Sequence, residues 1–191
     1  MDHIKKLKIV ITAGASGIGA EIAKTLSDAG AQVIICDIDQ SNLDVFTQNN
    51  PKVIALKADV SVEEEVLSLF DAVKKHFGEI NALINNAGIA GPSAKLEDTD
   101  FKDWKQTISV NLNGAFLCSR SAIPLLKLSD GGSIVNIGST SSFMGTPLRS
   151  SYAASKWGLI GLTKTWAMEY GADNVRINTI CPSSVLSLIH I

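Results

Sequence analysis

A short apolar run rich in valine and isoleucine recurs six times along the chain, and longer stretches with helical spacing lie between the runs. The runs are apolar on both faces, which is typical of strands buried inside a parallel sheet. Alternation of such strands with helices requires right-handed crossovers, so the sequence predicts one doubly wound α/β sheet. The six predicted strands are Leu7–Thr12, Gln32–Cys36, Lys52–Ala58, Ile80–Asn85, Ser133–Gly138 and Val175–Cys181.

The stretches between the strands predict helices on both faces of the sheet. Apolar residues recur at helical spacing between Val62 and Phe77, and Ser61 with Glu64 is typical of a capping box at the start of that helix. Two longer helices are predicted at about 101–127 and 151–170. Ligands of such sheets bind outside the carboxyl ends of the strands, so we expect a single site there.

Composition narrows the class of protein. The chain has 191 residues, 46% of them hydrophobic and 19% charged, which favours one globular domain. The net charge is −2 and no basic run occurs, so nucleic acid and anionic membranes are poor partners. Cys36, Cys118 and Cys181 form no zinc or disulfide pattern, and no apolar run reaches the length of a membrane span. A reducing cytoplasm fits best.

A glycine-rich turn follows the first strand. Its spacing is G-x-x-G-x-G rather than G-x-G-x-x-G, and it leads directly into a helix. Small residues allow the backbone to approach a pyrophosphate, and a helix N-terminus offers free N–H groups to it. An ordinary tight turn is the alternative, but the position after the first strand favours nucleotide binding. The residues expected at the phosphates are Gly14, Ser16, Gly17, Ile18 and Gly19.

Two aspartates follow the next two strands. Asp37 is placed to accept hydrogen bonds from the adenosine ribose and would repel a 2′-phosphate. Neither Ala15 nor Ile38 supplies a compensating base, so NAD is favoured over NADP. Asp59, followed by Val60, is expected either at the adenine edge or as a loop or capping residue.

A tyrosine and a lysine four residues apart, Tyr152 and Lys156, share one helical face. A free phenol titrates near pH ~10, and a neighbouring cation favours its ionised form. A surface pair is the alternative interpretation. Ser139 at the end of the fifth strand and Asn111 inside a predicted helix make a catalytic group the better hypothesis.

Taken together, these residues resemble the short-chain dehydrogenase/reductase family in its single-domain form. The resemblance runs from about residue 7 to 185. The matching pieces are the glycine turn, Asp59-Val60, Asn85-Asn86-Ala87-Gly88, Asn111, Ser139 with Tyr152 and Lys156, and Arg176-Ile177-Asn178 leading to Cys181-Pro182. It implies a Rossmann fold with six of an expected seven strands. It also implies hydride transfer between a nicotinamide and a secondary alcohol or ketone, and a homo-oligomer that is a tetramer or a dimer.

The resemblance implies a role for each matching residue. Tyr152 would exchange a proton with the substrate oxygen, and Ser139 would stabilise the charge on that oxygen. Lys156 would favour the ionised tyrosine and bind the nicotinamide ribose, while Asn111 would hold a water that links the lysine to solvent. Asn86, Ala87 and Gly88 would support the adenosine side, and Pro182 would approach the nicotinamide. No metal is implied.

Two positions depart from the family pattern, which has glycine where this chain has Ala13 and Ser183. If position 13 requires a positive φ, alanine costs about 1–2 kcal/mol there. Ser183 lies in the loop expected near the nicotinamide, so the geometry of that loop is in question.

Several alternatives remain open from sequence alone. A non-catalytic NAD-binding sensor or scaffold would not need the serine, tyrosine and lysine together, and a sugar-nucleotide epimerase or dehydratase would need a longer C-terminal region. A 3-oxoacyl-carrier-protein, a simple secondary alcohol, a sugar or polyol and a steroid-like ring are all possible substrates. We expect residues 1–185 to form the domain. We expect Leu186–Ile191 to be foreign, because these residues are what the codons CTG TCT CTT ATA CAC ATC encode, and that string resembles a transposon adapter end.

Overall fold

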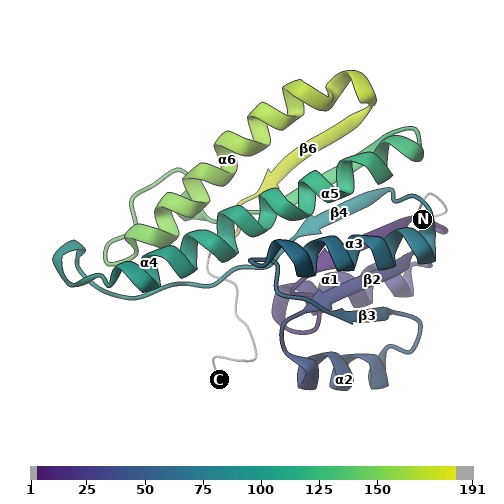
Figure 1. Ribbon diagram of the computed structural model, residues 1–191, viewed down its shortest axis with the longest axis horizontal. Helices are drawn as coiled ribbons and strands as arrows, with labels where there is room; N and C mark the ends of the chain where they lie inside the picture. Colours follow the sequence, from purple (N-terminus) through teal and green to yellow (C-terminus); the bar gives the residue numbers. More distant parts are fainter. Residues whose placement is uncertain (1–3, 184–191) are drawn as a thin grey trace.

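A computed structural model describes residues 4–183, and its centre is a parallel sheet with the strand order β3-β2-β1-β4-β5-β6 (Figure 1). This order is that of the Rossmann fold, so the predicted fold class is confirmed. The predicted tail at 186–191 lies outside the described residues. The strands are β1 Lys8–Thr12, β2 Gln32–Asp37, β3 Ile54–Lys57, β4 Ala82–Asn85, β5 Gly132–Ile137 and β6 Val175–Ile180.

Helices cover both faces of the sheet, and none within residues 4–183 is long and apolar enough to cross a membrane. Helices α3, α5 and α6 lie over one face, where they share a core with Val10, Leu83 and Ile134 (Figure 1). Helices α1 and α2 pack on the other face against Ile11 and Ile35. The helices are α1 Gly17–Asp28, α2 Gln40–Asn49, α3 Glu63–Phe77, α4 Phe101–Ile108, α5 Gly114–Leu128 and α6 Ser150–Tyr170.

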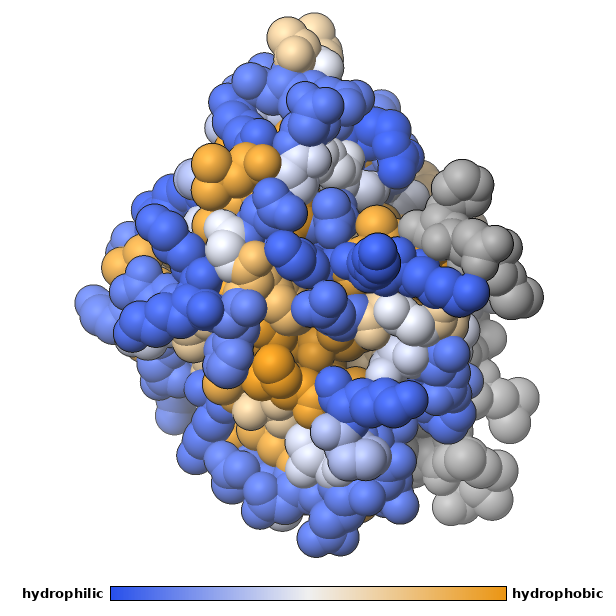
Figure 2. All heavy atoms as spheres, turned by 90° about the vertical axis from the view of Figure 1, so that its right-hand side faces the viewer, coloured by the Kyte–Doolittle hydropathy of each residue, from blue (hydrophilic) through white to orange (hydrophobic). Residues whose placement is uncertain are grey.

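The surface is mixed rather than uniformly polar. On the side of the molecule that lies at the right of Figure 1, hydrophobic residues reach the surface in one central patch, and hydrophilic residues surround it (Figure 2). Around the other end of the sheet, where the strands finish, lie the glycine turn, Ser139 and the first turns of α6. The fold therefore brings the predicted functional segments to one edge of the sheet, as parallel strands do.

The long helix expected at about 101–127 is interrupted. A π-helical segment, Ser109–Asn113, joins α4 to α5 and has Asn111 at its centre. A π turn shifts the backbone hydrogen bonds by one residue, and such turns occur often at functional sites. The apolar periodicity of the sequence carries no signal for this interruption.

Two expectations about local structure were wrong. The helix predicted to start with a capping box at Ser61 begins at Glu63 with Val62 as its N-cap, and no side chain caps it. Ser61 instead donates its N–H and hydroxyl to Asp59 Oδ1. Strand β6 is not apolar on both faces, because Arg176 and Asn178 are exposed and β6 pairs only with β5 within the described residues.

Candidate active site

The glycine turn places an open helix N-terminus beside the ends of β1 and β4. Ser16 is the N-cap of α1, and its side chain makes no capping hydrogen bond. The first N–H groups of a helix have no partner within the helix, so those of the first turn of α1 remain free for an anion. Gly17 has φ 53°, and a Cβ added there would meet no atom within 4 Å. The turn is open on the side of Gly17.

Gly14 and Gly19 lie behind the turn, and protein contacts rather than ligand contacts demand glycine there. A Cβ on Gly14 would lie 2.6 Å from the side chain of Ile35. A Cβ on Gly19 would clash with the carbonyl oxygen of Ala13 and lie 2.5 Å from Asn86 Nδ2. These two glycines shape the turn from within, while Ser16, Gly17 and Ile18 line the clefts on its open side.

Ala13 adopts φ 48°, in the left-handed region that favours glycine. An alanine in this conformation destabilises the fold by about 1–2 kcal/mol relative to glycine. Its carbonyl is held in place, since Asn86 Nδ2 donates to the carbonyl oxygens of Ala13 at 2.9 Å and Thr12 at 3.1 Å. The turn keeps its shape at the expense of local backbone strain.

Thr12 joins the turn to the segment after β4. Its buried hydroxyl oxygen accepts the N–H groups of Asn86 and Ala87, both at 3.0 Å. It donates to the carbonyl of Ile84 over 3.5 Å. Sequence reasoning treated Thr12 only as part of the turn. A hydroxyl at the end of an otherwise apolar strand is the signal that could have revealed this role.

The two aspartates are held by backbone N–H groups. Asp37 is 7% exposed and accepts from Ala15 N at 3.3 Å and from Asp39 N at 3.1 Å. Asp59 accepts a hydrogen bond from the N–H of Ser61, as expected of the loop or capping residue that was the alternative prediction. Both aspartates nevertheless line one cleft of about 280 Å³, together with Ala13, Ser16, Ile38, Val60, Ala87 and Gly88. We call this the aspartate cleft.

A second cleft of about 370 Å³ adjoins the first, because Gly88 and Ile89 line both. It brings the glycine turn together with the tyrosine and the lysine. We call it the tyrosine cleft. Its predicted residues are Gly17, Ile18, Asn86, Gly88, Ser139, Tyr152, Lys156 and Pro182, and its further residues are Ile89, Ala90, Ile137, Gly138 and Ser183.

Ser139 is oriented by the turn that follows β5. Its Oγ accepts the N–H of Ser141 at 3.2 Å, and its own N–H donates to Ser142 Oγ at 3.1 Å. Because the Ser139 oxygen accepts the N–H of Ser141, its hydroxyl proton stays available to a group in the cleft. Thr140 N donates to the carbonyl of Pro182 over 3.1 Å, which holds the loop after β6 beside this serine.

Lys156 is buried, at 5% exposure, although it is an ammonium group. Its Nζ donates to the carbonyl oxygen of Ile137 at 2.7 Å and lies 5.7 Å from the centre of the Tyr152 ring. Burial lowers the pKa of Lys156 to about 8, while the Cys181 thiol acts in the opposite direction. Helix α6 therefore places the side chain of Tyr152 and the desolvated amine of Lys156 in the same cleft.

Asn111 does not line either cleft, but it bonds to Ile89, which lines both. Its Oδ1 accepts from Ile89 N at 2.8 Å, and its Nδ2 donates to Ile89 O at 2.9 Å and to Ser155 Oγ at 3.1 Å. A Cβ on Gly88 would lie 3.4 Å from Asn111 Oδ1 and 3.5 Å from Lys156 Nζ. Asn111 thus clamps the loop that forms the wall shared by the two clefts.

Arg149 is a residue that sequence reasoning missed. Its Nη1 donates to the carbonyl oxygens of Gly91 at 2.8 Å and Ala90 at 3.3 Å, so it ties the start of α6 to the loop that lines the tyrosine cleft. Gln106 also lines the aspartate cleft. Neither residue belongs to a recognisable spacing, and only the tertiary structure brings them to the site.

The residues of the joined clefts fit a dinucleotide. The open glycine turn and helix N-terminus suit a pyrophosphate, and the buried Asp37 carboxylate offers acceptors to a ribose. Ala13 and Ser16 of the turn line the aspartate cleft, and Gly17 and Ile18 of the turn line the tyrosine cleft, which also holds the phenol and the amine. One end of the ligand would thus meet the Asp37 carboxylate, and the other would meet a phenol and an amine.

Comparison with known proteins agrees with this geometry. Residues 7–190 match the family model described as short chain dehydrogenase. The chain is 35% identical to cis-4-hydroxycyclohexanecarboxylate dehydrogenase of Sinomonas cyclohexanicum, covering 91% of this chain and 71% of the relative. It is 36% identical to 3-oxoacyl-[acyl-carrier-protein] reductase of Thermotoga maritima, covering 92% and 73%.

Solved structures give the same result. Levodione reductase superposes with a TM-score of 0.92 at 32% identity, covering 96% of this chain and 74% of that one. A 3-ketoacyl-(acyl-carrier-protein) reductase from Brucella melitensis, complexed with NADH, superposes with a TM-score of 0.90 at 28% identity, covering 94% and 76%.

Fold, site and relatives define a nicotinamide-dependent oxidoreductase of secondary alcohols and ketones. The chain belongs to the short-chain dehydrogenase family. The predicted reaction class is confirmed, and the non-catalytic alternative gains no support from these relatives.

Proposed function

We propose that the chain oxidises a secondary alcohol, or reduces the matching ketone, with NAD as cofactor and with Ser139, Tyr152, Lys156 and Asn111 as its functional residues. The observation that carries this proposal is the meeting of Ser139, Tyr152 and Lys156 in the cleft that also opens onto Gly17. The nicotinamide, when bound, supplies or accepts the hydride. The protein's own groups orient the reactants and handle the proton.

Proton transfer is assigned to Tyr152. Its phenol exchanges a proton with the substrate oxygen, and the ammonium of Lys156 in the same cleft favours the ionised phenol. Ser139 donates its free hydroxyl proton to the same oxygen and stabilises the charge that develops there. Ser139 follows β5 and Tyr152 lies on α6, so the substrate oxygen must bind between these two elements.

Lys156 and Asn111 hold the surroundings of that proton. Lys156 binds the nicotinamide ribose from the floor of the cleft, where the carbonyl of Ile137 fixes its Nζ. Asn111 clamps Ile89 and, with the π turn around it, holds a water that connects Lys156 with solvent. Gly17, Ile18, Asn86 and Pro182 line the remaining cofactor wall.

The choice of NAD over NADP rests on the aspartate cleft. Asp37 carries its charge at the position where a ribose 2′-hydroxyl would bind, and a 2′-phosphate would be repelled there. Ile38, which is 60% exposed in the same cleft, provides no positive charge. We therefore expect turnover with NAD to exceed turnover with NADP.

A panel assay tests this function. The enzyme is mixed with NAD or NADP and with 4-hydroxycyclohexanecarboxylate, 3-hydroxybutyrate, a polyol and a hydroxysteroid, while nicotinamide absorbance is followed. The same panel is run in reverse with the corresponding ketones and a 3-oxoacyl carrier protein. Turnover of at least one alcohol–ketone pair that is lost in Ser139→Ala supports the proposal. Turnover unchanged in Ser139→Ala contradicts the assignment of that serine.

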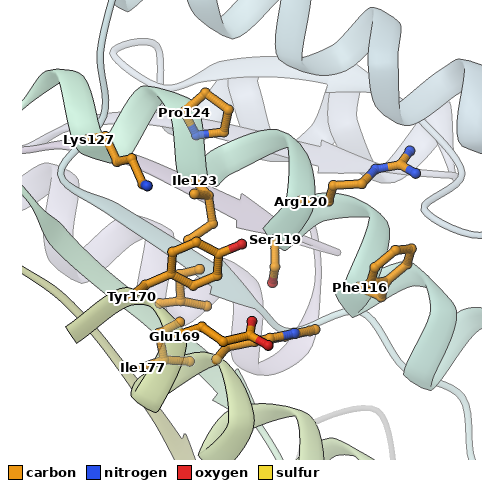
Figure 3. A pocket seen from close by; sticks show the side chains of 11 residues that line it. Phe116, Ser119, Arg120, Ile123, Pro124, Lys127, Glu169, Tyr170 and Ile177 are labelled. Carbon is orange, nitrogen blue, oxygen red and sulfur yellow. The ribbon is translucent and has the colours of Figure 1, made fainter. Parts of the chain in front are cut away.

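A homo-oligomer is proposed on the basis of a groove between α5 and α6. The two helices diverge over β5 and β6 and leave a cavity of about 460 Å³ (Figures 1 and 3). Its apolar lining includes Phe116, Ile123, Trp166 and Ile177. Arg120 and Lys127 on α5 also line it, and they are paired with Glu63 and Asp173. Phe116 in this groove is exposed although it is a large aromatic residue, and an apolar surface groove is typical of a protein–protein contact, so a second copy of this chain is the proposed occupant.

The mass of the particle in solution tests the oligomer. We expect more than one chain per particle by light scattering, and dissociation on Trp166→Glu because a charge would be placed in the apolar groove. Met168→Glu is the matched control, since Met168 lies on the same helix, is 86% exposed and does not line the groove. A monomeric wild type, or a Trp166 variant that keeps its mass, contradicts the proposal.

A reducing cytoplasmic compartment is proposed for the enzyme. All three cysteines are free, and Cys36 and Cys118 are buried. Free thiols of this kind are typical of proteins kept in reducing conditions. Fractionation of the source cells with cytoplasmic and extracellular markers checks this assignment, and recovery with the extracellular marker contradicts it.

A further inference from the structure

A row of polar side chains crosses three neighbouring strands just before their carboxyl ends. Asn85 on β4 is the register partner of Asn136 on β5, and Asn136 is the register partner of Thr179 on β6. Asn85 is 5% exposed and Asn136 is fully buried. Central strands of a parallel sheet normally carry apolar residues at such positions, and a buried amide is costly unless it is hydrogen-bonded. The presence of these buried polar residues in the sheet therefore needs an explanation.

The hydrogen bonds of the row lead to α6. Asn85 Nδ2 donates to Asn136 Oδ1 at 2.8 Å, and Asn136 Nδ2 donates to Thr163 Oγ1 at 2.8 Å. The Thr163 hydroxyl donates its one proton to the carbonyl of Leu159 at 2.8 Å. Its contact of 2.7 Å with Thr179 Oγ1 must then be a bond that Thr179 donates. Thr163 is thus saturated by three partners from β5, β6 and its own helix.

A second tether joins the same two elements. The carbonyl of Ile137, the residue after Asn136, accepts Lys156 Nζ at 2.7 Å. Lys156 and Thr163 lie about two turns apart on one face of α6. Adjacent residues of β5 therefore hold α6 at two points, one at Lys156 in the tyrosine cleft and one at Thr163, about two turns further along the helix.

We propose that Asn136 and Thr163 are positioning residues, which fix the height and rotation of α6 on the sheet so that Tyr152 and Lys156 stand correctly in the tyrosine cleft. This inference rests on the proposed function. Apolar contacts, such as those of buried Leu159 between the two tethers, hold a helix against a sheet but are not directional. Hydrogen bonds depend on angle and distance, so the hydrogen-bonded pair of the Asn136 amide and the Thr163 hydroxyl specifies one position.

The test compares Thr163→Val, which keeps the shape of the side chain and removes the hydroxyl, with Thr163→Ser, which restores the hydroxyl. The assay is oxidation of the panel alcohol that wild type turns over best, measured with NAD across pH. We expect Thr163→Val to lower kcat about tenfold or more, because small displacements of catalytic groups are costly. The midpoint of the rise of kcat with pH should move upward by about half a pH unit or more, since the ammonium no longer stands beside the phenol. Thr163→Ser should return within about threefold of wild type.

Thr165→Val is the matched control, because Thr165 lies on the same helix and is exposed. It should keep the wild-type kcat and pH profile. If Thr163→Val does not fold, Thr179→Val removes one of the three bonds at the edge strand and should show the same pH shift to a smaller degree. Melting temperature and NADH fluorescence titration accompany each variant.

The possible outcomes distinguish failure of the positioning role from failure of the proposed function. Loss of melting temperature with unchanged kcat and pH profile in Thr163→Val means that the row only stabilises the fold, and overturns the inference. Equal losses in Thr163→Ser and Thr163→Val overturn it too, because the hydroxyl would then not be the cause. Retained turnover in Tyr152→Phe overturns the proposed function itself, whatever the threonine variants show.

Discussion

The two halves of the sheet hold their functional groups by different means. Around β1 and β2, backbone geometry defines the site: glycines allow close approach, and backbone N–H groups orient Asp37. Around β5 and α6, buried side chains define it, through Lys156 on a strand carbonyl and Asn136 on Thr163. A site built from backbone tolerates few added atoms, whereas a site built from side chains depends on bonds that single substitutions can remove.

The largest expected effect lies in the backbone-defined half. Gly19→Ala places a Cβ against the carbonyl of Ala13 and 2.5 Å from Asn86 Nδ2, and backbone cannot move aside as a side chain can. We expect a loss of more than about 3 kcal/mol in the free energy of unfolding, with NADH binding lost as well. Chemical denaturation and NADH titration measure both.

Gly161→Ala is the control for this prediction. Gly161 lies inside α6, and a Cβ there would meet no atom within 4 Å. Alanine should stabilise the helix by about 0.5–1 kcal/mol. If Gly19→Ala and Gly161→Ala behave alike, the glycine turn is not constrained as the contacts imply.

The next effect concerns the side-chain half and depends on pH. Burial lowers the pKa of Lys156 to about 8 from 10.5, so the unfolded chain binds more protons than the folded chain between these values. The resulting destabilisation is complete below pH 8 and is relieved as the pH rises toward 10.5. Relative to Lys156→Met, wild type should gain about 2 kcal/mol of stability between about pH 7 and pH 9.5.

Denaturation of both proteins at several pH values checks this sign. A difference between wild type and Lys156→Met that stays constant over the window would mean that the buried lysine keeps its ordinary pKa. Activity should be absent from Lys156→Met throughout, because the amine is proposed to act in the cleft.

A smaller effect is expected for cofactor choice. Asp37→Ala together with Ile38→Arg removes a negative charge and adds a positive one in the aspartate cleft. The ratio of kcat/KM for NADP to that for NAD should rise about tenfold or more, or at least about 1.4 kcal/mol. A wild type that already prefers NADP would contradict the role given to Asp37 before any variant is made.

The smallest effect is a gain. Ala13→Gly relieves the left-handed φ of 48°, and after the greater chain entropy of glycine is subtracted we expect about 0.5–1 kcal/mol of added stability. Ala20→Gly, inside α1, should instead destabilise by about 1 kcal/mol. Melting curves of the two variants that shift in the same direction would show that position 13 is not strained.

The comparison of the two halves also explains what could be predicted from sequence. The glycine turn was visible because conformational demands select one residue type, and strand and helix order followed from apolar periodicity. The position of Tyr152 four residues before Lys156 needed only helical geometry. Asn136 and Thr163 could not be paired in advance, since they come from separate elements and their partnership exists only after α6 packs on the sheet.

Other features had no sequence signal of their own. The π turn around Asn111 preserves the apolar pattern of a continuous helix, so periodicity could not reveal it. The start of α3 was misplaced because Asp59 competes for Ser61, and a capping-box pattern does not tell which carboxylate the serine will meet. Local patterns therefore predicted the elements, while contacts between elements decided the details of the site.

The most direct test of the account measures turnover and NADH binding on the same preparation of Tyr152→Phe. The variant keeps the ring and removes only the hydroxyl, so the proton path should be lost while the cofactor site remains. We predict that turnover of the best panel substrate falls by more than about a hundredfold and that the Kd for NADH changes by less than about threefold. Tyr170→Phe, the same change at the far end of α6, should leave both unchanged. A Tyr152→Phe enzyme that keeps more than about a tenth of wild-type turnover, a loss below about 1.4 kcal/mol, would contradict the assignment of Tyr152 as the proton donor and acceptor.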